Sequence, residues 1–302
     1  PDLEHLVLAG AAPLTGAGNA LANWLRGNAG DNVLYGGEGC DVLFGDAGED
    51  RLHGEAGTDL LQGGSGDDRL QDLEGSGLLS GDAGADVLIA GGGRQLIAGG
   101  TGGDAITTGE GIDVLLFNHG DGADRLRLGR GGGDVLSLGG ALHYADLALH
   151  RDGGALVLGL GGADSLTFED WYAAPADRGV VTLQVIADAM ADFAAGAADP
   201  LLSRKVQTFD FAGLVERFDA AADRDAAASP WSLTDALLDF HLAASDGAAL
   251  GGDLAYQYGH GGSLAGIGAA AARTIVEAAQ FGTAPQALHP IADLATGTVR
   301  LS

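Results

Sequence analysis

An apolar residue recurs every nine positions between residues 27 and 116, and glycine-rich stretches separate these residues. The segment divides into ten blocks of nine without an insertion, with glycine mainly at positions one, two and four and aspartate usually at position six. Since glycine permits the positive φ angles of tight turns, each block predicts a turn followed by a short strand. The apolar residues at position eight, counted from a weaker preceding block at 18–26, are Leu25, Leu34, Leu43, Leu52, Leu61, Leu70, Leu79, Leu88, Ile97, Ile106 and Leu115.

A single block cannot bury its apolar residue, so neighbouring blocks must stack on one another. Two further copies, at 119–127 and 129–137, follow the contiguous blocks with a shifted phase. The periodic pattern therefore predicts an elongated β structure with a narrow apolar core.

The blocks resemble the RTX nonapeptide G-G-x-G-x-D-x-U-x, with U apolar, of haemolysin-type Ca²⁺-binding proteins. The first blocks read GNAGDNVLY, GGEGCDVLF and GDAGEDRLH. The resemblance implies a right-handed parallel β-roll with two blocks per coil, and several Ca²⁺ ions held in the turns between successive coils. At the spacing of paired strands, the contiguous blocks would make a stack about 24 Å long.

With two blocks per coil, turns on the same edge of the roll are 18 residues apart. Edge one then carries, at position six, Asn32, Asp50, Asp68, Asp86 and Asp104. Edge two carries Asn23, Asp41, Asp59, Gly77, Gln95 and Asp113. A Ca²⁺ ion between adjacent turns would take carboxylates from two stacked aspartates and carbonyl oxygens from the backbone, which supplies the six to eight oxygens that it prefers.

On this basis edge one is nearly intact, and Asp50, Asp68, Asp86 and Asp104 are its strongest candidate ligands. Edge two has a candidate site at Asp41 and Asp59, and then a gap, because Gly77 has no side chain and Gln95 offers only a neutral carbonyl. The shifted copies place further candidates at Asp124 and Asp134. Without metal, stacked aspartates repel one another, so we expect Ca²⁺ binding to be coupled to folding.

The charge balance is strongly acidic, with 42 Asp and Glu against 15 Lys and Arg and a net charge of −27. Phosphate binding needs basic patches, so we expect neither a nucleic-acid partner nor binding to an anionic membrane surface. The carboxylates instead suit hard divalent cations. The single cysteine, Cys40, excludes an internal disulfide and a zinc site built from cysteines.

The sequence predicts three units besides the roll, which itself spans residues 27–138. They are an N-terminal cap or partial repeat at 1–26, a β-rich cap at 139–180 and a mostly helical module at 181–302. In the cap we expect strands at 147–150, 155–160 and 165–171, with a hairpin turn at 152–154. Its aromatic residues suggest a hydrophobic end cap. They are Phe117, Phe168, Trp171 and Tyr172.

In the last unit, helical spacing of apolar residues predicts helices over 181–195, 209–222, 232–244 and 263–281. This unit resembles the C-terminal region of large RTX proteins exported by type I secretion, whose signal is C-terminal and uncleaved. The first residues contain neither Met nor a signal peptide, and no apolar run is long enough to span a membrane, so we expect a fragment of a longer secreted protein.

No sequence motif indicates catalysis. The histidines form no H-E-x-x-H pair, and Gly261-Gly262-Ser263-Leu264-Ala265 lacks the second glycine of a nucleophile elbow. We therefore expect a non-enzymatic calcium-binding module at the C-terminal end of a large protein, an adhesin, that folds on Ca²⁺ binding after type I secretion.

Its expected location is the extracellular space or the cell surface of a Gram-negative bacterium, and its expected partners are Ca²⁺ ions and the type I secretion machinery. An alternative is the Ca²⁺-dependent C-terminal tail of an RTX enzyme, a lipase, protease or epimerase, whose catalytic domain lies upstream. A third is a module that binds a cell-surface or glycan ligand.

Overall fold

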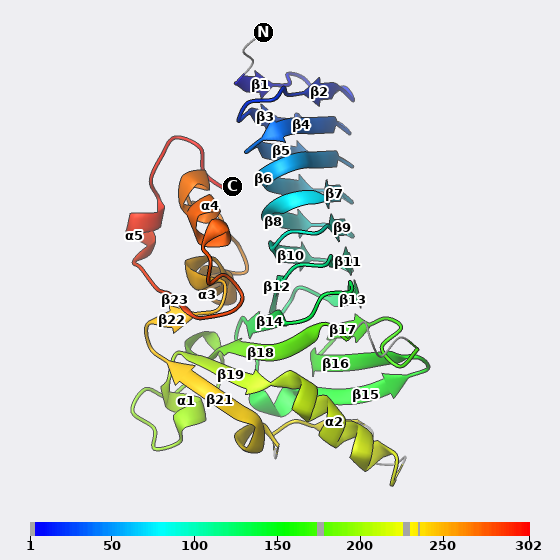
Figure 1. The fold of residues 1–302 in the computed structure, drawn as a ribbon, viewed down its shortest axis with the longest axis vertical. Coiled ribbons are helices and arrows are strands. Elements are labelled where there is room, and N and C mark those ends of the chain that lie inside the picture. Colours follow the sequence, from blue (N-terminus) through cyan, green and yellow to red (C-terminus); the bar gives the residue numbers. More distant parts are fainter. Residues whose placement is uncertain (1–3, 174–177, 226–229, 235) are drawn as a thin grey trace.

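Two ladders of parallel strands form a roll that occupies the upper half of the molecule (Figure 1). The computed structural model describes residues 4–173, 178–225, 230–234 and 236–302. In both ladders, paired residues along the blocks are 18 positions apart, as Leu25 with Leu43 and Leu34 with Leu52. The parallel β-roll with two blocks per coil is thereby confirmed.

One ladder forms the face that the C-terminal helices cover, and we name it the covered face. Its strands are β1 (His5–Val7), β3 (Trp24–Arg26), β5 (Val42–Ala47), the later part of β6 (Arg51–Ser65), β8 (Glu74–Ala83), β10 (Gln95–Thr101), β12 (Val114–Asn118), β14 (Asp134–Gly139) and β18 (Val180–Ile186).

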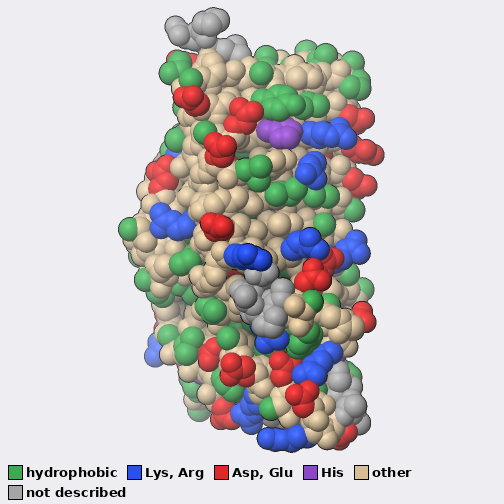
Figure 2. All heavy atoms as spheres, turned by 45° about the vertical axis from the view of Figure 1, so that its right-hand side comes forward, with side chains coloured by type: hydrophobic (Ala, Val, Ile, Leu, Met, Phe, Trp, Pro, Cys, Tyr) green, Lys and Arg blue, Asp and Glu red, His purple; other side chains and the backbone are tan. Residues whose placement is uncertain are grey.

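The other ladder we name the open face, which carries a mixture of basic, acidic and apolar side chains (Figure 2). Its strands are β2 (Thr15–Ala17), β4 (Val33–Gly39), the first part of β6, β7 (Arg69–Asp72), β9 (Val87–Ala90), β11 (Ala105–Thr107), β13 (Ala123–Arg127) and β17 (Asp164–Phe168). Tyr35 and His53 stack on this face with ring centroids 4.8 Å apart.

The apolar residues at position eight fill the space between the two ladders. From Leu25 to Leu115 each of them is at most 1% exposed. Leu126 and Leu136 continue this core through the shifted copies. Burial of a leucine side chain contributes about 1.5–3 kcal/mol, so this column is the main apolar contribution to the roll.

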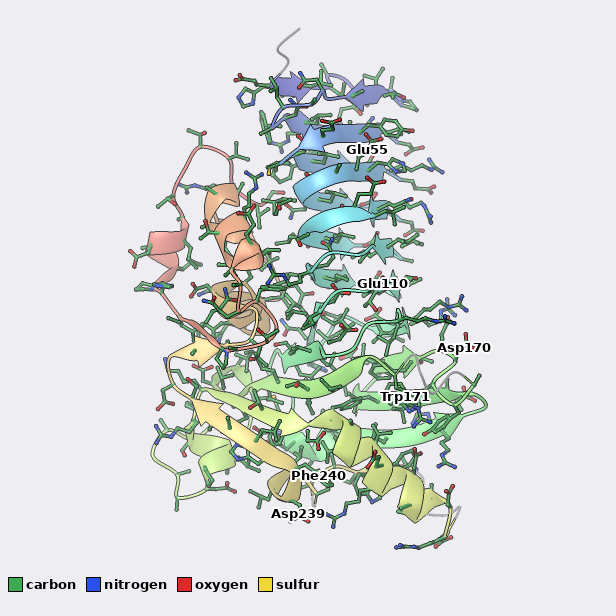
Figure 3. The ribbon with its side chains drawn as sticks, in the orientation of Figure 1. Glu55, Glu110, Asp170, Trp171, Asp239 and Phe240 are labelled. Atoms are coloured by element: carbon green, nitrogen blue, oxygen red, sulfur yellow. The ribbon has the colours of Figure 1, made fainter. Side chains whose placement is uncertain are left out.

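A β-rich cap closes the end of the roll. β15 (Ala148–Asp152) and β16 (Ala155–Gly161) form the expected hairpin, and β16 pairs antiparallel with β17. The aromatic rings pack as an end cap, with Trp171 5.4 Å from Phe168 and 6.3 Å from Phe211 between centroids (Figure 3). A 3-10 turn at Tyr144–Asp146 precedes the hairpin.

Two of the expected C-terminal helices are strands. Residues 180–186 form β18, which pairs parallel with β14, and β19 (Val206–Asp210) pairs antiparallel with β18. Much of 232–244 is likewise not helical, because β21 (His241–Ser245) pairs with β19. The edge of β14 offers unpaired backbone groups to β18, and the edge of β19 offers them to β21, which outweighs a helical spacing of apolar residues.

The other helical expectations are met in part. α2 (Phe211–Ala222) begins at the Asp210 N-cap, and α4 (Ala269–Glu277) forms the centre of the stretch expected at 263–281. The last unit is therefore a mixed α and β structure rather than a mostly helical one. Its remaining elements are α1 (Pro200–Ser203), β20 (Trp231–Ser232), β22 (Ala248–Ala249), α3 (Gly252–Gly261), β23 (Gln286–Ala287), α5 (Ile291–Leu294) and 3-10 turns at Ala187–Ala189 and Leu237–Phe240.

The helices α3 and α4 lie against the covered face (Figure 1). On this face position seven of the blocks is apolar, and these outward side chains are buried against the helices. They are Val42, Leu60, Leu78, Leu96 and Val114. Arg273 on α4 also donates to the carbonyl oxygens of Cys40 (2.9 Å) and Thr58 (3.3 Å) in the edge-two turns. No helix among the described residues is long and apolar enough to cross a membrane.

Candidate metal centre

The position-six residues of edge one form a continuous buried row. In this row each backbone N–H donates to the Oδ1 atom of the residue one coil further on, at 2.6–2.8 Å. The row consists of Asn32, Asp50, Asp68, Asp86, Asp104 and Asp124, each at most 2% exposed. The turns thus fix every carboxylate in the same orientation.

The second carboxylate oxygen of these aspartates has no partner. The Oδ2 atoms concerned are buried and accept no hydrogen bond, in Asp41, Asp50, Asp59, Asp68, Asp86, Asp104 and Asp124. A buried acceptor without a partner costs about 1–3 kcal/mol, and more when it is charged. A row of such oxygens therefore fits a bound cation.

Glycine at position one keeps the space beside each Oδ2 atom free of side chains. A Cβ on Gly45 would lie 2.4 Å from Asp50 Oδ2 and 2.5 Å from the carbonyl oxygen of Gly63. A Cβ on Gly81 would lie 2.3 Å from Asp86 Oδ2 and 2.4 Å from the carbonyl oxygen of Gly99. A carboxylate oxygen and a backbone carbonyl oxygen thus share each cradle, and this donor set suits Ca²⁺.

Burial raises the pKa of these carboxyl groups because the charged form loses its hydration. The pKa of Asp50 rises to about 6 and that of Asp68 to about 7, while the backbone N–H bond to each carboxylate opposes the rise. In Asp86 and Asp124 the negative charges of neighbouring aspartates add to burial, and each pKa rises to about 8. The roll therefore holds many carboxylates that a cation would stabilise.

Edge two repeats the arrangement in two separate stretches. The N–H of Asp41 donates to Asp59 Oδ1 at 2.8 Å, and the N–H of Asp113 donates to Asp134 Oδ1 at 3.0 Å. Between these stretches lies the turn of Gly77, where position six offers no side chain. Asp41, Asp59 and Asp113 are fully buried and Asp134 is 2% exposed, so both stretches are inside the roll.

The shifted copies continue both edges because loops absorb the extra residues. The N–H of Asp104 donates to Asp124 Oδ1 at 2.6 Å across 20 residues, where regular coils have 18. Asp113 and Asp134 are bonded across 21 residues in the same way. The structure thus places Asp124 in the row of edge one and Asp134 in the row of edge two, whereas the sequence had given them as further candidates without an edge.

The motif does not identify three further buried aspartates near the rows. Asp121, at position three of a shifted copy, accepts from the hydroxyl of Tyr258 at 2.9 Å and so connects α3 with a turn of the roll. Asp164 accepts from the N–H of Gly120 at 2.8 Å. Asp72 lies fully buried beside the turn of Gly77. Only Asp72 has a sequence signal, since it stands at position one of its block, where glycine is usual.

The candidate sites use few side chains each. Among the described residues no group of three or more His, Cys, Asp and Glu side chains converges on one point. The sites as built combine one or two carboxylates with backbone carbonyl oxygens, which are ligands of Ca²⁺ and not of soft metals.

Four overlapping segments match the family model of the RTX calcium-binding nonapeptide repeat, at residues 17–52, 41–70, 71–106 and 80–115. The chain contains RTX calcium-binding nonapeptide repeats. The repeats of this RTX roll belong to a calcium-binding family, and their number implies several Ca²⁺ ions. The matched residues contain most of both aspartate rows.

A solved structure that resembles the RTX chain is the crystal structure of the extracellular lipase LipA from Serratia marcescens. The sequence identity is 18% and the TM-score is 0.29. The match covers 54% of this chain and 37% of the lipase chain, so the RTX chain spans well under half of the lipase. A search of curated proteins finds no match.

Proposed function

We propose that this chain is a calcium-dependent folding module of a larger secreted RTX protein. The observation that carries the proposal is the set of buried Oδ2 atoms without hydrogen-bond partners along both edges of the roll. Beside the Oδ2 atoms at six of these positions, a glycine at position one of the block leaves a space free of side chains. The positions are Asp41, Asp50, Asp59, Asp68, Asp86 and Asp104.

Ca²⁺ would be held by the aspartates at position six and by the backbone carbonyl oxygens of the adjacent glycines. The ligands proposed for edge one are Asn32, Asp50, Asp68, Asp86, Asp104 and Asp124, and those for edge two are Asp41, Asp59, Asp113 and Asp134. Since the carboxylates of successive coils come together only in the folded roll, the binding free energy of the ions becomes folding free energy.

The coupling of metal binding to folding suits export of an unfolded chain. At the low Ca²⁺ concentration of a cytosol the roll would remain unfolded, and it would fold outside, where Ca²⁺ is abundant. We place the module at the C-terminal end of a non-catalytic secreted or surface protein, an adhesin, with the export signal in residues 181–302. The match to the RTX calcium-binding repeat supports the part of this proposal that concerns a secreted, Ca²⁺-binding protein.

The test is a Ca²⁺ titration followed by far-UV circular dichroism, starting from protein in EGTA, with Mg²⁺ as the control cation. We expect a large gain of β signal with Ca²⁺ and little change with Mg²⁺, because Mg²⁺ demands a smaller octahedral site and gives up its water reluctantly. A spectrum that is the same in EGTA and in Ca²⁺ would mean that the roll is preformed, and the proposal would fail.

A further inference from the structure

In block 72–80 the usual residues of positions one and six are reversed, so that aspartate stands at position one and glycine at position six. The other blocks of edge two have Gly36, Gly54, Ala90 and Thr108 at position one and a residue with a side-chain oxygen at position six. In block 72–80, position one is Asp72 and position six is Gly77. The carboxylate that position six lacks is therefore present five residues earlier in the same turn.

The exchange brings Asp72 to the space that a position-six side chain would fill. A Cβ on Gly77 would lie 2.6 Å from Asp72 Oδ2, 2.5 Å from the carbonyl oxygen of Asp59 and 3.0 Å from Gln95 Oε1. Three oxygens from three successive turns of edge two thus surround this point. Since Gly77 has no side chain, nothing of its own fills the space.

Three buried side-chain oxygens of these residues lack hydrogen-bond partners. Asp72 and Gln95 are both fully buried, and Asp72 Oδ1 and Gln95 Oε1 accept no hydrogen bond. Asp59 Oδ2 is also buried without a partner.

We propose that Asp59, Asp72 and the side-chain oxygen of Gln95 hold a Ca²⁺ ion beside Gly77, at the point where the nonapeptide motif leaves edge two without a ligand. This inference rests on the proposed function, because it adds one ion to a roll that binds several. Asp72 then does from position one what aspartate does from position six elsewhere. Edge two has no gap at this turn, and its two stretches form one continuous row of sites.

The side-chain amide of Gln95 offers a competing explanation of this turn, in which no metal ion is bound. Gln95 Nε2 donates to Asp72 Oδ2 at 3.0 Å and to the carbonyl oxygen of Gly75 at 3.1 Å. If this amide group replaced the ion, the turn would be held without metal, and Asp72 would have a structural role only. The two explanations differ in the number of ions bound.

The experiment counts bound Ca²⁺ by native mass spectrometry at a concentration that saturates the wild-type protein. We expect Asp72→Asn to bind one ion fewer than the wild type. The matched control is Asp67→Asn, which makes the same chemical change at an exposed residue of the neighbouring block and keeps the wild-type count. An Asp72→Asn protein that folds and binds the full wild-type number of ions would overturn the inference.

A second variant protects the test against misfolding of Asp72→Asn, which circular dichroism at saturating Ca²⁺ would reveal. Gln95→Glu keeps a side-chain oxygen at the site but changes the amide to a carboxylate. If Gln95 is a ligand, the count stays at the wild-type number. If the amide replaces the ion, Gln95→Glu creates a site and adds one ion, which overturns the inference. A wild-type protein that binds no Ca²⁺ would instead refute the proposed function itself.

Discussion

At the scale of single residues, the aspartate at position six uses its two oxygens differently. Oδ1 accepts the backbone N–H of the previous coil, as Asp68 does from Asp50 at 2.8 Å, and this bond fixes the side chain. Oδ2 is left buried and without a partner in most of these aspartates, while Asp113 Oδ2 accepts from the N–H of Gly109 at 3.3 Å. The hydrogen bond therefore positions the carboxylate, and the free oxygen is the atom that remains for a cation.

The same residues predict a pH dependence. Burial raises the pKa of Asp59, Asp86 and Asp124 to about 8 in the metal-free roll, but in the unfolded chain, from which Ca²⁺-coupled folding starts, aspartates titrate near about 4. These carboxylates are therefore ionised at both pH 6 and pH 8 before Ca²⁺ binds. We expect the Ca²⁺ concentration at the folding midpoint to change by less than about threefold over this range and to rise as the pH falls toward 4. Titrations followed by circular dichroism at several pH values measure it.

In EGTA the pH effect has the opposite sign. A carboxyl group whose pKa is higher in the folded state binds more protons there, so it stabilises the metal-free roll at low pH. This contribution is complete below the unfolded value near 4 and is lost as pH rises through about 6–8. A Ca²⁺ midpoint that stays constant as the pH falls from about 6 to about 4 would show that these carboxylates are not the ligands.

At the scale of elements, the two faces of the roll differ at position seven. On the open face this position carries exposed arginines such as Arg51 or partly exposed apolar residues such as Val87. On the covered face it carries fully buried residues such as Leu96 and Val114. The apolar side chains of the covered face pack against α3 and α4, so the helices complete a second core outside the roll.

A matched pair of substitutions tests this second core. Val114, at position seven of the covered face, is fully buried, whereas Val87, at the same position of the open face, is partly exposed. We expect Val114→Ala to lower the free energy of unfolding by about 2 kcal/mol, and Val87→Ala by less than about 1 kcal/mol. Urea denaturation in excess Ca²⁺ measures both, and equal losses would contradict packing of the helices on this face.

At the scale of the whole molecule, the C-terminal segment depends on the roll for its packing surface. Leu254, Ala272 and Val276 of α3 and α4 are buried against strands that are brought together only when the coils stack. Helices of nine or ten residues are marginal in water without such packing. Folding of the roll and ordering of the C-terminal helices are therefore coupled.

Limited trypsin digestion tests this coupling at Arg273, whose guanidinium bonds to carbonyl oxygens of two edge-two turns. We expect cleavage after Arg273 to be slow in Ca²⁺ and at least about tenfold faster in EGTA, because the turns that hold the side chain would no longer be formed. An unfolded reference substrate in both buffers controls for the effect of Ca²⁺ on trypsin. Equal rates at Arg273 would mean that the C-terminal helices fold without the roll.

Some features of this protein follow from local repetition and could be predicted. The period of nine places an apolar residue such as Leu61 at the centre of each coil, and the identical turns bring Asp50, Asp68 and Asp86 into one row. The hairpin of β15 and β16 could also be predicted, since a glycine-rich turn separates two segments in which apolar and polar residues alternate. In each case neighbours in the sequence, or copies of the same block, make the deciding contact.

The sequence by itself therefore determined the roll, its core and the two rows of aspartates. Tertiary structure decided the rest, because there the partner is distant in the chain. Residues 180–186 became a strand since β14 offered an unpaired edge, and Asp72 entered edge two because folding brings position one beside the space at Gly77. The helices α3 and α4 pack on side chains such as Leu78 and Leu96, which form one surface only when the coils stack.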